Sequence, residues 1–131
     1  MEESLALMFV GAACSLLGLV MNINPIKFDE DLYGKWEGDL SDRETTLRNF
    51  GAQLRCATGA LLIAIGIIAL YNRELPTGDA ENLLVSMGIG FVVLMGVIVA
   101  GFYRKFIDFI VVPPLVIFTV LSSVCFYAGL M

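Results

Sequence analysis

Four cations and one carboxylate are the side chains of this sequence best placed to do chemistry. Arg48 and Arg55 are seven residues apart, which is two helical turns, so they share one helix face. Arg104, Lys105 and Asp108 lie close together further along the chain. Guanidinium and ammonium groups bind phosphate and carboxylate oxygens. The spacing therefore predicts a lipid- or anion-binding cluster of the four cations and an ion pair between Arg55 and Asp108.

A second interpretation of the arginine pair stays open. An apolar run begins just after Arg55, so the two arginines stand where a helix enters a membrane. Long cationic side chains at such a position keep their stems in hydrocarbon and their charges among the headgroups. Arg48 and Arg55 would then be anchors that fix the topology and would bind no specific ligand.

The residues needed for catalysis are missing from the rest of the chain. The sequence has no histidine, which excludes His-ligated haem, histidine proton shuttles and the usual zinc and copper sites. The long apolar runs carry no Asp, Glu or Lys far from their ends, so acid–base chemistry has few possible actors. We expect no catalytic residues, no metal site, no cofactor and no enzymatic activity.

Composition shows which kind of protein must position the cations. Of the 131 residues, 58% are hydrophobic and only 16% are charged, and the mean hydropathy is +0.83. The charges gather in short clusters separated by apolar runs of about 20 residues, the length that crosses a bilayer core. The net charge of −5 leaves no basic surface for nucleic acid. The sequence predicts one all-α domain, 1–131, in the form of an integral membrane bundle of four transmembrane helices.

The charge clusters set the limits of the spans. We expect them at about 5–23, 52–71, 80–103 and 107–130, with an acidic, aromatic loop at 24–42. Ser41 and Glu44 form a capping-box pattern, so the second helix should begin in water and continue unbroken to about Tyr71. Pro113 and Pro114 remove backbone donors, so the fourth helix is either kinked just before them or starts at Pro113.

Small residues recur at helical spacing within the spans. Gly11, Ser15, Gly18 and Asn22 form a small, weakly polar stripe on the first span. Small residues let membrane helices approach closely, so the stripe indicates a packing face. The glycines expected at helix contacts are Gly11, Gly18, Gly59, Gly66, Gly88, Gly90 and Gly96.

The distribution of cations predicts the orientation. Four spans place both termini on one side and the first and third loops on the other. Seven of the eight cations fall on the loop side, and only Arg73 falls with the termini. The positive-inside rule makes the loop side cytoplasmic. We expect both termini to be non-cytoplasmic, in a plasma or inner membrane.

The chain resembles the small four-span bacterial-type membrane proteins of unknown function. The residues that carry the resemblance are the Arg48–Gly51 step, Gly59 and the Arg104–Asp108 turn. The resemblance implies a four-helix membrane fold and no activity. The first span lacks the glutamate of small multidrug carriers, and the Asn- and Thr/Ser-rich signature of fluoride channels is missing.

Two functions remain compatible with these features. The first is a non-catalytic polytopic protein that packs or assembles, with itself or within a larger membrane complex. The alternative is a small protein or conduit that binds a lipid or an anion through its cytoplasmic cations. Membrane lipids are partners in both cases, and nucleic acid is a partner in neither.

Overall fold

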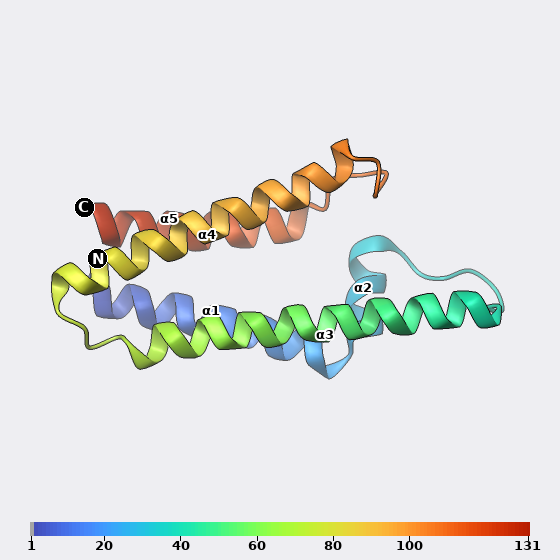
Figure 1. Cartoon of the computed structure of the whole chain (residues 1–131), viewed down its shortest axis with the longest axis horizontal. Helices are drawn as coiled ribbons and strands as arrows, with labels where there is room; N and C mark the ends of the chain where they lie inside the picture. The colour runs from blue at the N-terminus through green and yellow to red at the C-terminus, as the bar shows by residue number, and fades with distance from the viewer. Residues whose placement is uncertain (1) are drawn as a thin grey trace. The chain divides into compact units, whose positions relative to one another are not determined.

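The computed structural model describes residues 2–131, and all regular secondary structure in that range is helical. Every helix but the second is long and apolar enough to cross a membrane. The prediction of an all-α integral membrane protein with four spanning helices is therefore confirmed. The helices, labelled in Figure 1, are α1 (Glu3–Ile23), α2 (Pro25–Tyr33), α3 (Asp42–Tyr71), α4 (Thr77–Tyr103) and α5 (Val112–Leu130).

The contacts divide the chain into two compact units. One comprises Gly11–Ile68, and we call it the α2–α3 unit because it contains α2, nearly all of α3 and most of α1. The other comprises the chain up to Val10 together with Ala69–Met131, and we call it the α4–α5 unit. The single domain expected for the whole chain stays a prediction.

The long helix α3 begins where the capping pattern placed it. The backbone N–H of Glu44 donates to Ser41 Oγ at 3.2 Å, and Ser41 Oγ donates to Glu44 Oε1 at 3.1 Å. From Asp42 the helix continues without a break to Tyr71. Its 30 residues rise about 45 Å, which exceeds a hydrocarbon core of about 30 Å. The first turns of α3 therefore extend beyond the apolar layer, as the sequence predicted.

The short helix α2 was not expected, because the sequence analysis treated 24–42 as a loop. The side-chain oxygen of Asn24 accepts the N–H of Lys27 at 3.1 Å, and Pro25 occupies the first helical turn. At the other end Gly34 has φ of 102°, a left-handed value that stops the helix. An Asn-Pro start and a Gly stop are ordinary helix signals. They enclose only nine residues, too few to give a clear periodic pattern.

Within the α2–α3 unit, α1 and α3 touch through the predicted small-residue stripe. A Cβ added to Gly18 would overlap the carbonyl oxygen of Gly59, and one added to Gly66 would meet the carbonyl oxygen of Gly11 at 2.7 Å. The amide of Asn22 donates to the carbonyl of Cys56 on α3 at 3.2 Å. These glycines therefore lie where α1 and α3 approach each other closely.

In the α4–α5 unit the two helices lie side by side, as Figure 1 shows. Phe91 and Phe118 stack between them with ring centroids 5.8 Å apart. A Cβ on Gly88 would meet the ring of Phe126 at 3.0 Å, so this glycine lies where α4 and α5 approach each other closely. Gly129 packs just as closely, with Val85 Cγ2 at 2.8 Å from an added Cβ, and the sequence analysis missed it.

Gly90 and Gly96 do not take part in this packing. Within residues 2–131, no atom lies within 4 Å of a Cβ built on either glycine. For Gly90 the reason is rotational position, because a residue two places after Gly88 points to the opposite side of the helix. Neither glycine lies at the contact between α4 and α5, and their expected role in helix contacts stays a prediction.

The connection between α4 and α5 corrects the fourth predicted span. The N–H of Phe106 donates to the Gly101 carbonyl at 3.0 Å, and the N–H of Lys105 donates to the Phe102 carbonyl at 3.1 Å. These bonds form a Schellman motif, which ends α4 with Lys105 in the left-handed region at φ of 62°. The chain then runs without helix to Val112, where α5 starts with the two prolines in its first turn. The span therefore begins near residue 112 rather than 107, and the expected break before the prolines is confirmed.

Candidate ligand-binding cleft

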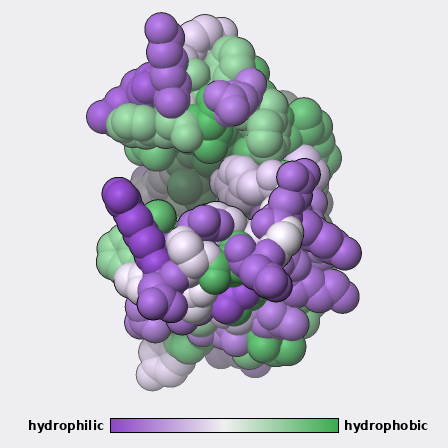
Figure 2. All heavy atoms as spheres, turned by 90° about the vertical axis from the view of Figure 1, so that its right-hand side faces the viewer, coloured by the Kyte–Doolittle hydropathy of each residue, from purple (hydrophilic) through white to green (hydrophobic). Residues whose placement is uncertain are grey.

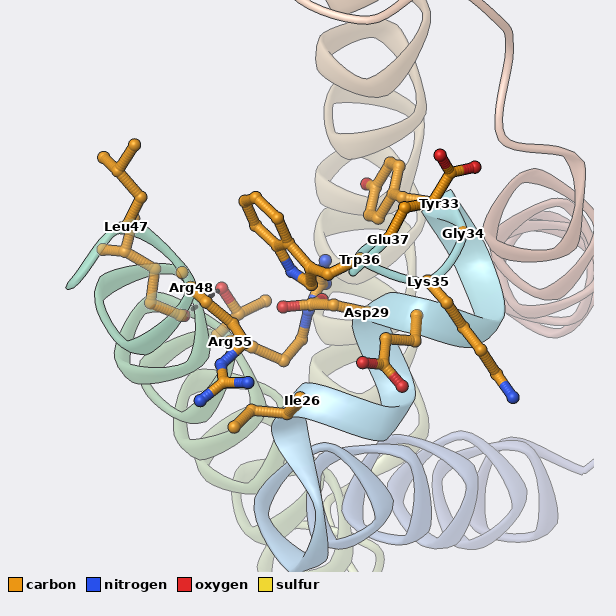
Figure 3. A pocket seen from close by; sticks show the side chains of 14 residues that line it. Ile26, Asp29, Tyr33, Gly34, Lys35, Trp36, Glu37, Leu47, Arg48 and Arg55 are labelled. Atoms are coloured by element: carbon orange, nitrogen blue, oxygen red, sulfur yellow. Dashed lines mark hydrogen bonds and ion pairs between the residues drawn. The ribbon is translucent and has the colours of Figure 1, made fainter. Parts of the chain in front are cut away.

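A cleft of about 640 Å³ opens within the α2–α3 unit, between α2, the segment after it and the first half of α3. Its volume falls in the usual range of small-molecule sites. Figure 3 shows lining side chains that come from both sides of the cleft. The charged lining residues are Asp29, Glu30, Lys35, Glu37, Arg48 and Arg55, and the larger apolar or aromatic ones are Ile26, Tyr33, Trp36, Leu47 and Leu54.

The cleft lies at a polar end of its unit. Figure 2 faces this end and shows hydrophilic side chains gathered where α2 and the start of α3 lie. Tyr33 and Trp36 line the cleft, and each is 44% exposed. Tyrosine and tryptophan favour the headgroup layer of a membrane, where the ring meets hydrocarbon and the polar atom meets water. The cleft thus combines a polar end of the unit with two aromatic side chains that are about half exposed.

Arg55 forms an ion pair with Asp29 in the cleft. Its Nε donates to Asp29 Oδ1 at 2.7 Å, and the two side chains are only 20% and 29% exposed. Its guanidinium carbon also lies 5.1 Å from the centre of the Phe28 ring, a cation–π contact. Arg55 is thus held by two residues of α2, and its charge is balanced within the protein.

The partner of Arg55 differs from the one that the sequence suggested. Asp29 lies 26 residues away in the sequence and was assigned to a loop, so nothing in the spacing pointed to it. Asp108 belongs to the α4–α5 unit, so its expected ion pair with Arg55 stays a prediction. The signals that could have found Asp29 are the Asn-Pro start and the Gly stop, which turn its segment into a helix.

Arg48 lines the same cleft, as expected from its seven-residue spacing to Arg55. The side chain is half-buried, and its Nε atom is buried without a hydrogen-bond partner in residues 2–131. A buried donor that stays unpaired costs about 1–3 kcal/mol, and more when the group is charged. Arg48 therefore adds to the cleft lining a cation that forms no ion pair within residues 2–131.

The other two predicted cations lie in the α4–α5 unit. Arg104 is exposed, and its guanidinium carbon lies 4.5 Å from the centre of the Phe106 ring. Lys105 lines a smaller hollow of about 400 Å³, and Asp108 lines the same hollow. The structure thus brings Arg48 and Arg55 into one cleft and places Lys105 beside Asp108. The joint site of all four cations stays a prediction.

The chemistry that the cleft offers is binding by charge and hydrogen bonds. Guanidinium groups suit phosphate and carboxylate oxygens, and the aromatic rim suits an amphipathic ligand. Among residues 2–131, no three Cys, Asp or Glu side chains lie close enough together to hold a metal ion. The expectation that no cofactor is bound stays an expectation.

Comparison with known proteins adds no further constraint on the cleft. No protein family, no curated protein and no solved structure matches this chain.

Proposed function

We propose that this protein is a non-catalytic membrane protein whose cleft binds the phosphate-bearing headgroup of a membrane lipid. The observation that carries the proposal is that Arg48 lines a cleft of ligand size and forms no ion pair within residues 2–131. Phosphate oxygens are strong acceptors for guanidinium donors. A lipid supplies such oxygens at the depth where the aromatic rim of the cleft would lie.

The two arginines have different roles in this proposal. The charge of Arg55 is already balanced by Asp29, so Arg55 holds α2 against α3 and shapes the cleft. Arg48 makes no ion pair in the part of the chain that the structure describes, so it is the residue that contacts phosphate. A leucine at position 48 removes the contact, whereas a leucine at position 55 deforms the wall.

Removal of Arg48 is the direct test. The protein is purified in a mild detergent, and the lipid that it retains is identified by native mass spectrometry. Arg48→Leu should reduce retention about tenfold or more, because a hydrogen bond to a charged group is worth about 1.5–3 kcal/mol. Arg43→Leu is the matched control, because Arg43 is exposed near the start of the same helix and does not line the cleft.

A second experiment distinguishes a lipid phosphate from a free phosphate ion. Purified protein is exposed either to inorganic phosphate or to short-chain phospholipid, and the melting temperature is followed. Stabilisation by the phospholipid alone supports a lipid site, and stabilisation by phosphate alone replaces it with a site for a soluble anion. Equal retention by the Arg48 and Arg43 variants would contradict the proposal.

We also propose that the cleft faces the cytoplasm and that both termini lie on the opposite side. The support is the seven-to-one division of cations between the two sides. The test uses Asp39→Cys, in the segment after α2, in a background without the three native cysteines. If an impermeant thiol reagent labels this cysteine in intact cells, the segment after α2 lies outside the cytoplasm, and the proposed topology is wrong.

A second candidate function is assembly with another chain through α4. The observation that favours it is the open position of Gly90 and Gly96 on a membrane helix, where small residues allow a close approach. Gly90→Leu with Gly96→Leu should then abolish a dimer or complex seen by cross-linking in native membranes, while the lipid content stays unchanged. A chain that is monomeric in native membranes would remove this candidate.

A further inference from the structure

The charges that line the cleft balance one another. Three lining residues are acidic and three are basic. Asp29 and Arg55 neutralise each other directly, and Figure 3 shows Lys35 extending away from both arginines. Glu37 belongs to the segment after α2 and is exposed. The half-buried charges left for a ligand are therefore Arg48 and Glu30.

Glu30 and Arg48 do not satisfy each other. Neither side chain forms an ion pair in residues 2–131, although both line the same cleft. Two unlike charges that share a cleft without touching are satisfied together by a ligand that carries both signs. A half-buried charge without a partner is unfavourable, so both residues favour such a ligand.

The choice among lipid headgroups follows from this pair of charges. A headgroup with a net negative charge would satisfy Arg48 and bring its charge toward Glu30, which costs binding free energy. A zwitterionic headgroup presents phosphate to Arg48 and a cation to Glu30. A primary ammonium donates hydrogen bonds to a carboxylate, whereas a quaternary ammonium has no N–H to donate.

We infer that the cleft selects a zwitterionic phospholipid with a primary amine, held by its phosphate at Arg48 and by its ammonium at Glu30. The inference rests on the proposed function, because it names the lipid class for the same cleft. Trp36 on the wall of the cleft offers an aromatic face to either kind of ammonium group, so the preference for a primary amine depends on Glu30.

The test compares three lipids in otherwise identical nanodiscs: phosphatidylethanolamine, phosphatidylglycerol and phosphatidylcholine. Lipid retained after gentle extraction is counted by native mass spectrometry. Wild-type protein should retain phosphatidylethanolamine at least about fivefold better than either of the other two, a ratio typical of one charge-assisted contact. Glu30→Gln should remove the preference over phosphatidylglycerol and leave the phosphate contact.

The matched control is Asp31→Asn, because Asp31 is an exposed acid on the same short helix that does not line the cleft. It should keep the wild-type preference. Both substitutions leave the backbone carbonyl of Glu30, which accepts the Gly34 N–H at the end of α2, so the helix should persist. Circular dichroism and melting temperature verify that the variants are folded.

The outcomes separate the inference from the proposed function. Preferential retention of phosphatidylglycerol, or a Glu30→Gln variant with unchanged preference, would overturn the selection of a zwitterion. Equal retention of phosphatidylcholine would overturn the selection of a primary amine. Each of these results would leave a lipid site at Arg48. Failure of wild-type protein to retain any phospholipid would overturn the proposed function itself.

Discussion

The contact between α1 and α3 at Gly59 makes the sharpest stability prediction. A Cβ added at Gly59 would lie 2.5 Å from Asn22 Nδ2, 2.7 Å from the Gly18 carbonyl oxygen and 2.9 Å from Met21 Cβ. Carbon atoms normally pack at about 3.5–4.0 Å. The Gly18 oxygen belongs to the backbone, so it cannot swing aside, and Gly59→Ala must push the two helices apart.

The magnitude follows from two costs. Overpacking of this kind typically costs about 1–3 kcal/mol. The Asn22 amide would also be displaced from the Cys56 carbonyl, and an intramolecular hydrogen bond contributes about 0.5–1.5 kcal/mol. An alanine in a helix gains about 1 kcal/mol over glycine through propensity, which offsets part of the loss. The expected net effect is a destabilisation of about 1–3 kcal/mol.

The matched control makes the same substitution in open space. Gly90→Ala gains the same propensity term, but its Cβ would have no atom within 4 Å in residues 2–131. The propensity term cancels between the two variants, so their stabilities should differ by about 2–4 kcal/mol. Thermal unfolding in one detergent, followed by circular dichroism, measures the difference. Equal melting temperatures would show that α1 and α3 do not pack through Gly59.

Three further predictions concern an ion pair and two helix ends. Asp29→Asn should lower stability by about 1 kcal/mol because it breaks the partly buried pair with Arg55, and the exposed control Asp31→Asn should change it little; equal effects would refute the role of the pair. Lys105→Gly should raise the melting temperature, with a gain of about 0.5–1 kcal/mol, because glycine adopts the left-handed conformation without a Cβ penalty; no gain would argue against the turn. Pro114→Ala should change stability by less than about 1 kcal/mol, because the first turn of a helix has no partner for that N–H, whereas a loss near 3 kcal/mol would place the proline in a helix interior.

Several elements were predictable because their causes are local. The length of each apolar run sets a spanning helix, and Ser41 with Glu44 sets the start of α3 through bonds within one turn. The prolines prevent helix just before α5 for the same kind of reason. The small-residue stripe that includes Gly18 was also predictable, because residues three or four places apart share a helix face regardless of which helix packs against it.

The start of α5 was less predictable, although α4 ends at Tyr103 as the sequence predicted. Lys105 takes the left-handed conformation that glycine usually supplies, so no residue type marked the length of the turn after α4. The non-helical connection after α4 includes residues 107–111, which the sequence analysis assigned to the fourth span.

Tertiary structure alone decided which side chains meet. Gly88 and Gly90 look alike in the sequence, but only the face that α5 covers gives Gly88 a neighbour. Arg55 pairs with Asp29 because Asp29 belongs to the nine-residue helix α2, which lies against α3. The sequence by itself determined that cations stand at the membrane entry of α3. Whether each cation is paired or left for a ligand depends on contacts between segments far apart in the chain, because ion pairing acts over a few ångströms of space rather than along the sequence.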